Sequence, residues 1–355
     1  MMTSSRENQL FDAAGGDSAP AERAFVRDLS DGQAVDCIFL VKQRELRTRR
    51  NGDDYLTLTL GDNTGSVKAV CWEEVEPYQE IATLGAALRV RGRFNVHERY
   101  GPQLTIDALA PAQPDQYSLT DLLDGPSMDA RQMEQDLRGL IETVRNPHLR
   151  KLLDELFGER SPVWRSFGVA PAAKYYHQAY SHGLLEHTLL VGQAVSAISA
   201  SFPGVNRDLA VTGALVHDIG KIEAYAQDPL AIDLTDDGKL LGEIPLGYYL
   251  VRRKIEQIDG FPWDLARALL HIQLSHHGTH ENGSPVLPAT REATIVHSID
   301  NLGGKLGSFD RLQKELREGE SWSSFDRALS GSAYFAAHNG SSANGGDPVK
   351  LAAGE

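Results

Sequence analysis

The sequence is short of cysteine and of long apolar segments. Only two cysteines occur among 355 residues. Cys37 and Cys71 lack the paired spacing of a disulfide or zinc motif, so we interpret both as small apolar core residues. No segment approaches the roughly 18 apolar residues of a membrane span, and residues 1–24 lack the order of a signal peptide. We therefore expect a cytoplasmic protein with no membrane partner.

Positive charge is also scarce. Lys and Arg number 35 against 49 Asp and Glu, which gives a formal net charge of −14. A protein that holds nucleic acid over its whole surface normally presents a basic face, and this composition argues against one. The charge is uneven, because residues 34–110 contain ten basic and eleven acidic residues, a balance of −1, and the remainder carries −13. The sequence predicts a near-neutral domain joined to an acidic one.

The sequence lacks both the glycine-rich motifs that bind nucleotides and the usual setting of a nucleophilic residue. The chain has neither a Walker A loop nor a G-x-G-x-x-G motif, which argues against a glycine-rich nucleotide cradle. No serine or cysteine stands in the setting of a nucleophile. Chemistry in this chain therefore has to come from other side chains.

Length and pattern divide the chain into two domains with flexible ends. A chain of 355 residues exceeds the usual size of a single core. Residues 1–24 lack an apolar period and residues 335–355 are rich in Gly, Ser, Ala and Asn, so we expect a flexible N-terminus and a disordered tail. Between them we predict a strand-rich domain over residues 25–112, a linker with leading helices over 113–160, and a helical domain over 161–334.

Residues 34–110 show the period of two that is typical of strands. The segment Tyr-Leu-Thr-Leu-Thr-Leu over residues 55–60 alternates without a break, and turn signals over residues 50–53 and 61–65 flank it. Five such strands, with a short helix after the third, predict a small barrel. The layout resembles the OB-fold, whose strand face binds oligonucleotides.

Aromatic and basic side chains are interleaved on this predicted barrel. An exposed ring that stacks on a base contributes roughly 1–3 kcal/mol, which holds single strands without reading their sequence. Most rings in a small barrel are core residues, and for any single ring the core is the commoner place. We predict Phe39, Tyr55, Trp72, Arg91 and Arg93 as nucleic-acid-binding residues, chosen from a set that also contains Lys42, Arg44, Lys68, Phe94 and Tyr100.

Beyond a linker marked by Pro111 and Pro114 the apolar period becomes helical almost to the end of the chain. Leucines at 149, 152, 153 and 156, for example, lie on one face of a helix. The predicted fold class is multidomain α+β, with an N-terminal five-stranded OB-like barrel followed by an all-α domain.

Nine of the twelve histidines lie between positions 177 and 297. His187 and His217 stand in apolar helical segments, where a buried imidazole needs a partner, and Asp218 and Asp300 place carboxylates in similar surroundings. Imidazoles and carboxylates bind divalent first-row metals and leave a coordination position for water. His187 alone is more typical of a hydrogen-bonded core histidine, and a His-Asp pair is common by chance. Together, the four residues predict a metal site.

Residues 213–221, Gly-Ala-Leu-Val-His-Asp-Ile-Gly-Lys, resemble the HD superfamily of metal-dependent phosphohydrolases. In that superfamily the order His, His-Asp, Asp supplies the ligands of one metal. The resemblance assigns these ligand positions to His187, His217, Asp218 and Asp300.

The pair His276-His277 indicates a second metal. Two ions about 3.5–4 Å apart would let Asp218 bridge them and hold a shared hydroxide for attack on phosphorus. Neighbouring helical residues point about 100° apart, so both histidines could bind only if the helix ends there, as Gly278 allows. The sequence leaves open which of the two binds.

A closer resemblance is to the YhaM-type 3′→5′ exoribonucleases, which join an N-terminal OB-fold to an HD domain. It rests on the barrel in the expected place and on segments between residues 170 and 305, among them 183–188, 237–242, 275–278, 284–288 and 299–301. The resemblance implies that residues 25–112 form the OB-fold domain and residues 161–334 the HD phosphohydrolase domain.

One position departs from that family, because Glu243 stands where its members typically carry histidine. A carboxylate binds manganese or magnesium at least as readily as an imidazole, so Glu243 is a further candidate ligand; alternatively, the second site is weakened. Lys221 lies three residues after Asp218 on nearly the same helix face, where its charge could bind a phosphate oxygen, although a solvated lysine is the alternative. We predict Asp218 and Lys221 as the catalytic residues.

The expected cofactor is a pair of divalent metal ions, with Mn²⁺ first and Co²⁺, Ni²⁺, Fe²⁺ or Mg²⁺ as alternatives. The resemblance implies a metal-dependent 3′→5′ exonuclease on single-stranded RNA, with DNA as a further substrate. Metal-activated hydroxide would hydrolyse the terminal phosphodiester and release nucleoside 5′-monophosphates. Two alternatives stay open: a phosphohydrolase of small or cyclic nucleotides whose barrel serves assembly or regulation, and a non-catalytic binding module. The sequence also leaves open the choice of RNA or DNA and whether the chain forms a homo-oligomer.

Overall fold

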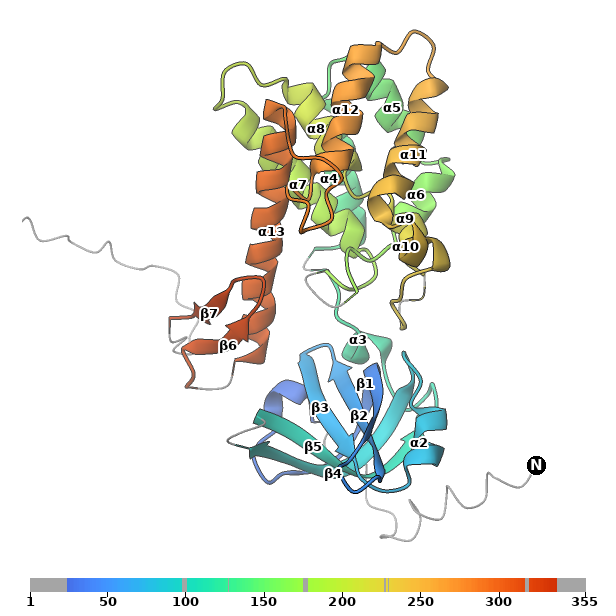
Figure 1. The fold of residues 1–355 in the computed structure, drawn as a ribbon, viewed down its shortest axis with the longest axis vertical. Coiled ribbons are helices and arrows are strands. Elements are labelled where there is room, and N and C mark those ends of the chain that lie inside the picture. Colours follow the sequence, from blue (N-terminus) through green and yellow to red (C-terminus); the bar gives the residue numbers. More distant parts are fainter. Residues whose placement is uncertain are drawn as a thin grey trace, which may run out of the picture.

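The chain folds into a β-barrel followed by a larger helical domain, as the computed structural model shows (Figure 1). The structure describes residues 24–97, 101–126, 128–174, 178–226, 228, 230–316 and 319–336. The predicted flexible N-terminus over 1–24 and disordered tail over 335–355 lie almost wholly outside these residues, as does Tyr100. None of the helices described is both long and apolar enough to cross a membrane.

Five strands close the barrel in the order β1-β2-β3-β5-β4. The pair β3–β5 is parallel and all other pairs are antiparallel. The five-stranded barrel and its short helix after the third strand confirm the predicted fold. The elements are η1 (Val26–Asp28), β1 (Ala34–Thr48), β2 (Asp54–Asp62), β3 (Gly65–Cys71), α2 (Val75–Ile81), β4 (Ala87–His97) and β5 (Gly101–Pro111).

Alternation along each strand fills the interior of the barrel. In β2, Leu56, Leu58 and Leu60 are buried while the threonines between them are partly exposed, because successive side chains of a strand point to opposite faces. Cys37 and Cys71 are buried and unpaired, which confirms their interpretation as core residues. The apolar face thus packs inward, and the outer face is left to polar side chains.

The second domain is a bundle of helices (Figure 1). Its elements are α3 (Leu119–Leu122), α4 (Ala130–Glu142), α5 (Pro147–Phe157), α6 (Pro162–Phe167), α7 (Gly183–Ser199), α8 (Arg207–Val216), α9 (Lys221–Ala224), α10 (Asp236–Leu240), α11 (Glu243–Glu256), α12 (Trp263–Ser275) and α13 (Arg291–Glu315).

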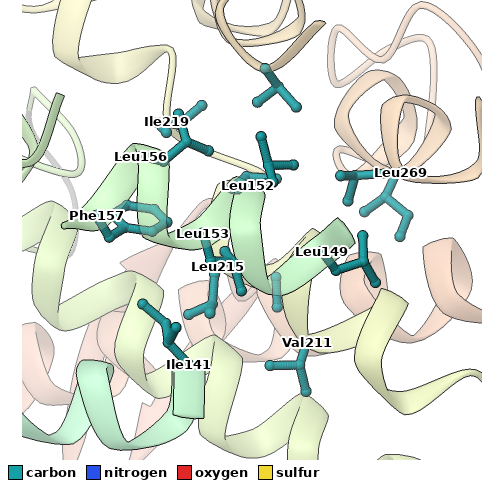
Figure 2. Close-up of a cluster of buried hydrophobic side chains, with 14 of the residues drawn as sticks. Ile141, Leu149, Leu152, Leu153, Leu156, Phe157, Val211, Leu215, Ile219 and Leu269 are labelled. Atoms are coloured by element: carbon teal, nitrogen blue, oxygen red, sulfur yellow. The ribbon is translucent and has the colours of Figure 1, made fainter. Parts of the chain in front are cut away.

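Helix α5 supplies the leucines of one part of the helical core. Figure 2 shows Leu152 and Leu153 beside Leu215 of α8, and all three are fully buried. Burying a leucine contributes roughly 1.5–3 kcal/mol, so this contact stabilises the bundle on which the site depends. Helix α8 begins at the Asn206 cap, whose side chain accepts from the Leu209 amide.

A two-stranded hairpin follows α13, and the sequence did not predict it. Strands β6 (Trp322–Asp326) and β7 (Gly331–Tyr334) pair with each other, and Asp326 accepts from Arg311 of α13 at 2.6 Å. Strands of five and four residues are too short to show a clear period. The domain is therefore helical except for this hairpin at its end.

The two domains touch through the segment that joins them. The Asn63 amide at the tip of the β2–β3 turn donates to the Asp121 carbonyl at 2.9 Å, and Asn63 Nδ2 donates to the Thr120 carbonyl. At the far end of α13, Lys314 Nζ lies 2.9 Å from Asp124 Oδ1. The short helix α3 thus lies between the barrel and the bundle in Figure 1.

Candidate metal centre

Four helices bring the sequence-predicted ligands together. His187 lies on α7, His217 and Asp218 follow the last residue of α8, and Asp300 lies on α13. His276 and His277 follow the last residue of α12. All except Asp300 and His277 are at least nine-tenths buried. Buried polar groups of this kind need partners, and here they face one another.

The first ligand group consists of His187, His217 and Asp300. The Nε2 atoms of the two histidines are 3.2 Å apart, and Asp300 Oδ1 lies 3.1 Å from His187 Nε2 and 3.7 Å from His217 Nε2. Ligand atoms that share one ion, each about 2.0–2.2 Å from it, have spacings of this size. The geometry therefore suits a metal at this point.

The second ligand group consists of Asp218, His276 and His277. Asp218 Oδ2 lies 3.3 Å from the Nε2 atoms of both His187 and His217, whereas its Oδ1 lies 3.5 Å from His276 Nε2. One carboxylate thus directs its two oxygens to different groups. Helix α12 ends at Ser275, and this ending lets both His276 and His277 face Asp218.

Two buried atoms of the second group show that it fits a cation. Among the described residues, Asp218 Oδ1 and His276 Nε2 have no hydrogen-bond partner. An unpaired buried carboxylate oxygen is costly, and a divalent metal would satisfy both atoms at once. The residues present therefore fit a metal ion here as they do in the first group.

Backbone carbonyls orient the imidazoles. The Nδ1 atoms of His217, His276 and His277 lie 2.7, 2.8 and 2.9 Å from the carbonyls of Ala214, Gln273 and Asn282 respectively. Such contacts place the proton on Nδ1 and leave the lone pair of Nε2 directed toward the site.

His297 supports this arrangement from outside the two groups. Its Nδ1 contacts the carbonyl of His276 at 2.8 Å, and its ring occupies the space next to Gly278, where a Cβ atom would lie 2.0 Å from the ring. The sequence analysis did not assign His297, although its position one helical turn before Asp300 was a usable signal. It is a positioning residue for the turn that carries His276.

The carboxylates of the two groups favour positive charge on their neighbours. Burial lowers the pKa of His217, but Asp218 and Asp300 outweigh it and bring the pKa to about 10. The pKa of His187 is raised by the same carboxylates against the same effect of burial. Burial acts to raise the pKa of Asp300, but the two histidines hold it well below its usual range. Without a metal, protons on the imidazoles neutralise this cluster of carboxylates.

Lys221 lies against Asp218, because its Nζ is 2.7 Å from Asp218 Oδ2. Burial lowers the pKa of Lys221, yet Asp218 outweighs it and the pKa is raised. The lysine is therefore charged and is not the solvated residue of the alternative interpretation. Its contact with phosphate stays a prediction.

Glu243 stands at the edge of the second group. It is the first residue of α11, and its Oε1 lies 3.7 Å from His277 Nε2. Burial and the neighbouring His276 lower the pKa of His277, which keeps its imidazole neutral as a ligand must be. Glu243 thus lies beside His277, although it is not among the three residues whose ligand atoms form the second group.

The structure places the barrel residues predicted to bind nucleic acid in different surroundings, some buried and some exposed. The prediction for Phe39 is wrong, because its ring is completely buried in the barrel core and cannot stack on a base. Tyr55 and Trp72 stack on each other with centroids 4.9 Å apart, and Trp72 is exposed. Arg49, which the sequence analysis missed, lies over the Trp72 ring at 4.2 Å.

The two predicted arginines of β4 lie elsewhere on the barrel. Arg93 is exposed, and its Nη1 donates to the Gly32 carbonyl at 2.8 Å. Arg91 is half-buried. Their binding of nucleic acid stays a prediction.

A basic hollow of about 730 Å³ lies on the β1–β2–β3 face of the barrel. Five cationic side chains and a single carboxylate, Glu45, are among the residues that line it. The cations are Lys42, Arg44, Arg47, Lys68 and Lys174. Arg47 pairs with Glu45 and Lys174 with Asp233, but the hollow still gathers more positive than negative charge in an acidic chain. Lys174 comes from the other domain, which is why strand patterns alone could not reveal the whole set.

Comparisons with known proteins agree with the two-domain division. Residues 184–303 match the HD domain family, and residues 41–112 match the OB-fold nucleic acid binding domain family. The HD match implies dependence on a divalent metal.

Similar proteins match over most of their length. A 3′-5′ exoribonuclease YhaM of Geobacillus sp. (strain WCH70) is 30% identical over 291 residues, which are 81% of this chain and 88% of that protein. The protein of the same name from Bacillus velezensis is 31% identical and that of Bacillus subtilis (strain 168) is 28% identical, each over 81% of this chain and 90% of the relative. The chain is thus similar to them in both domains.

Proposed function

The chain belongs to the YhaM family of 3′-5′ exoribonucleases, and from this membership we propose that it is a metal-dependent hydrolase that shortens single-stranded RNA from its 3′ end. One observation of the structure supports this most strongly. Asp218 directs Oδ2 toward His187 and His217 and Oδ1 toward His276, as a carboxylate that bridges two metal ions would.

We propose that each ligand group holds one ion. The first site would use His187, His217, Asp218 and Asp300, and the second Asp218, His276 and His277, with Glu243 as a further oxygen ligand. Mixed imidazole and carboxylate donors suit first-row ions, so we propose Mn²⁺, with Co²⁺, Ni²⁺, Fe²⁺ and Mg²⁺ as the ions to compare. Bound metal lowers the pKa of water enough to supply hydroxide near neutral pH and stabilises negative charge on phosphate.

The protein's own groups position the reaction. Hydrolysis joins the water oxygen to the terminal phosphorus and breaks the bond to the 3′ oxygen of the preceding nucleotide, which leaves with a proton. The products are a nucleoside 5′-monophosphate and an RNA with a new 3′ hydroxyl. Lys221, held 2.7 Å from Asp218, is placed to offset charge on the phosphate in the transition state.

The barrel would hold the strand upstream of the cleaved bond. The basic hollow supplies Lys42, Arg44 and Lys68 for backbone phosphates, which is binding without sequence reading. Trp72, which is exposed beside the half-buried Tyr55 and Arg49, offers a second surface on which a base can stack. Because these contacts do not distinguish the sugars, we propose that single-stranded DNA also binds.

A time course on RNA labelled at its 5′ end tests the proposal. Wild-type protein with Mn²⁺ should give a ladder that shortens from the 3′ end, and Asp218→Asn should leave the RNA intact, because an amide cannot serve both groups. Asp264→Asn is the matched control, since the Asp264 side chain is 94% exposed on α12 and should behave as wild type. An intact strand with wild-type protein would refute the proposal, and hydrolysis of a cyclic nucleotide would then favour the small-nucleotide alternative.

A further inference from the structure

A groove of about 990 Å³ runs away from the candidate metal centre between α7 and α13. These helices pack side by side (Figure 1). His187, a ligand of the first group, lines one end of the groove, and Arg27, Arg311 and Lys314 line it near the barrel. At this volume the groove is as large as the largest small-molecule pockets and has room for more than one nucleotide.

Aliphatic side chains of both helices line much of the groove, beside polar ones such as Gln178, Glu186 and Asp310. On α7, Leu190, Val191 and Ala194 follow His187 at helical spacing, so they lie on the same face as the ligand. On α13, Leu302 and Leu306 continue from the turn that carries Asp300. Leu190, Leu302 and Leu306 are 50%, 48% and 54% exposed. Three leucines half-exposed beside a polar centre call for an apolar group to cover them.

The groove and the basic hollow of the barrel each share lining residues with a third pocket that lies between the domains. Arg311 and Lys314 also line a pocket of about 240 Å³ between the domains, and that pocket shares Lys42 and Lys174 with the basic hollow. Cations thus line the route from the barrel to the groove, where the carboxylates Asp124, Glu186 and Asp310 accompany them and Lys314 pairs with Asp124. A polyanion with apolar faces suits this route, because its phosphates can meet the cations and its bases the leucines.

We infer that the α7–α13 groove binds the 3′-terminal nucleotides of the RNA, with their bases against Leu190, Leu302 and Leu306 and their phosphates toward the barrel-end cations. This assignment rests on the proposed function and adds the place where the 3′ end of the RNA binds. The leucines offer no hydrogen bonds to distinguish one base from another. The groove therefore supports removal of any nucleotide while requiring that a base be present.

Gly303 allows the groove to be filled without disturbing the fold. It lines the groove within α13, and a Cβ atom built there meets no atom within 4 Å. Gly303→Leu should project a side chain into the space proposed for the base. Gly139→Leu is the matched control, because Gly139 is an exposed glycine of α4 whose Cβ would also meet nothing within 4 Å.

The experiment compares two RNA substrates that differ only at the 3′ end, one with a terminal uridine and one with a terminal abasic ribose. At subsaturating RNA, Gly303→Leu should remove the uridine about tenfold more slowly than Gly139→Leu does. The abasic residue should be removed slowly by every variant, with little further loss in Gly303→Leu. Bound Mn²⁺ and melting temperature report whether each variant folds, and Leu306→Gln replaces Gly303→Leu if that variant does not.

Three results would overturn the inference while wild-type protein still shortens RNA. The first is equal rates for Gly303→Leu and Gly139→Leu, and the second is equal slowing on both substrates, which would indicate a structural effect. The third is a change in sedimentation mass without a selective effect on uridine, which would make the leucines an interface between copies of the chain. An RNA left uncut by wild-type protein is a different result, because it would refute the proposed function itself.

Discussion

Asp218 is the residue that both ligand groups share. It is 3% exposed and within 3.5 Å of three imidazoles and a lysine. Burial acts to raise its pKa, but Lys221 and His217 hold the pKa well below its usual range, so the carboxylate stays charged. A charged group in so buried a place is stable only because every neighbour is a cation or can bind one.

Removing His297 should weaken metal binding without removing a ligand. We expect His297→Ala to reduce Mn²⁺ affinity by about 10–100-fold, because the carbonyl of His276 loses its contact and the turn loosens. His280→Ala is the control, since His280 makes a similar contact to the Ser284 carbonyl but stands outside both ligand groups. Calorimetric titration measures both variants, and equal affinities would contradict the positioning role.

The metal-free protein should lose stability as the pH rises above neutrality. The pKa of His217 is raised to about 10 in the folded chain, so its stabilising contribution is complete below its ordinary value of about 6.5 and is lost as the pH approaches 10. The lowered pKa values of Asp218 and Asp300 leave their contributions constant over that range. Urea unfolding in chelator at pH 6.5 and 10 should show a lower midpoint at pH 10, and a higher one would contradict this.

For single residues, the sequence predicted which ones form the candidate metal centre, but not the burial or the contacts of every candidate. His187, His217, Asp218 and Asp300 could be found because polar residues in apolar helices are conspicuous. Phe39 was misassigned although it shares its strand face with buried residues, and that shared face was the better guide. Arg49 and Lys174 depend on contacts between segments distant in the chain, which no local pattern contains, whereas His297 had a local signal in its position one helical turn before Asp300.

The end of α8 determines where the central pair of ligands lies. The helix stops at Val216, and the chain turns through Asp218 to Gly220 before α9 begins. Gly220 allows this turn to approach α11 closely, since a Cβ there would lie 2.0 Å from the Glu243 carbonyl oxygen and 2.5 Å from the Gly247 nitrogen. Both neighbours are backbone atoms, which cannot move aside independently.

Gly220→Ala should therefore destabilise the fold by about 1–3 kcal/mol, as overpacking does. Gly139→Ala is the matched change, and it should stabilise the chain slightly because its Cβ is unobstructed and alanine favours the helix. Denaturant unfolding of both variants checks the pair. Similar stabilities for the two would show that the contact between α9 and α11 is looser than described.

Among the elements, long periodic segments were predictable and short ones were not. The barrel strands and the helix containing Leu149 follow periods of two and 3.6 over enough residues to be read. The β6–β7 hairpin is held by Arg311–Asp326 and by the ring pair of Trp322 and Tyr334, whose centroids are 5.0 Å apart. The ion pair joins the hairpin to α13 and the ring pair joins its two strands, so neither contact shows as a period along the local sequence.

For the whole molecule, the main feature is a basic route through an acidic protein. The net charge of −14 would repel RNA in general. The cations lining the basic hollow and the pocket between the domains concentrate attraction along one path. Composition could predict a near-neutral domain, but not that cations of both domains would meet.

The salt dependence of RNA binding by a Lys68 variant tests this route. We expect Lys68→Gln to weaken binding of single-stranded RNA about equally for all sequences and to reduce the slope of log affinity against log salt by about 0.7. Lys239→Gln removes the same charge from the exposed face of α10 and should leave the slope unchanged. Fluorescence anisotropy over a range of salt concentrations measures both. Equal slopes would show that the hollow does not hold the strand.

Titration of metal-free protein with Mn²⁺, with bound metal and RNA shortening followed together, tests the two-group centre most directly. Because Asp218 joins the groups, two ions should bind per chain, and RNA shortening should become full only with the second equivalent. Asp218→Asn should bind fewer ions and leave the RNA intact at any metal concentration. Full activity with a single bound ion per chain would contradict a bridging role for Asp218.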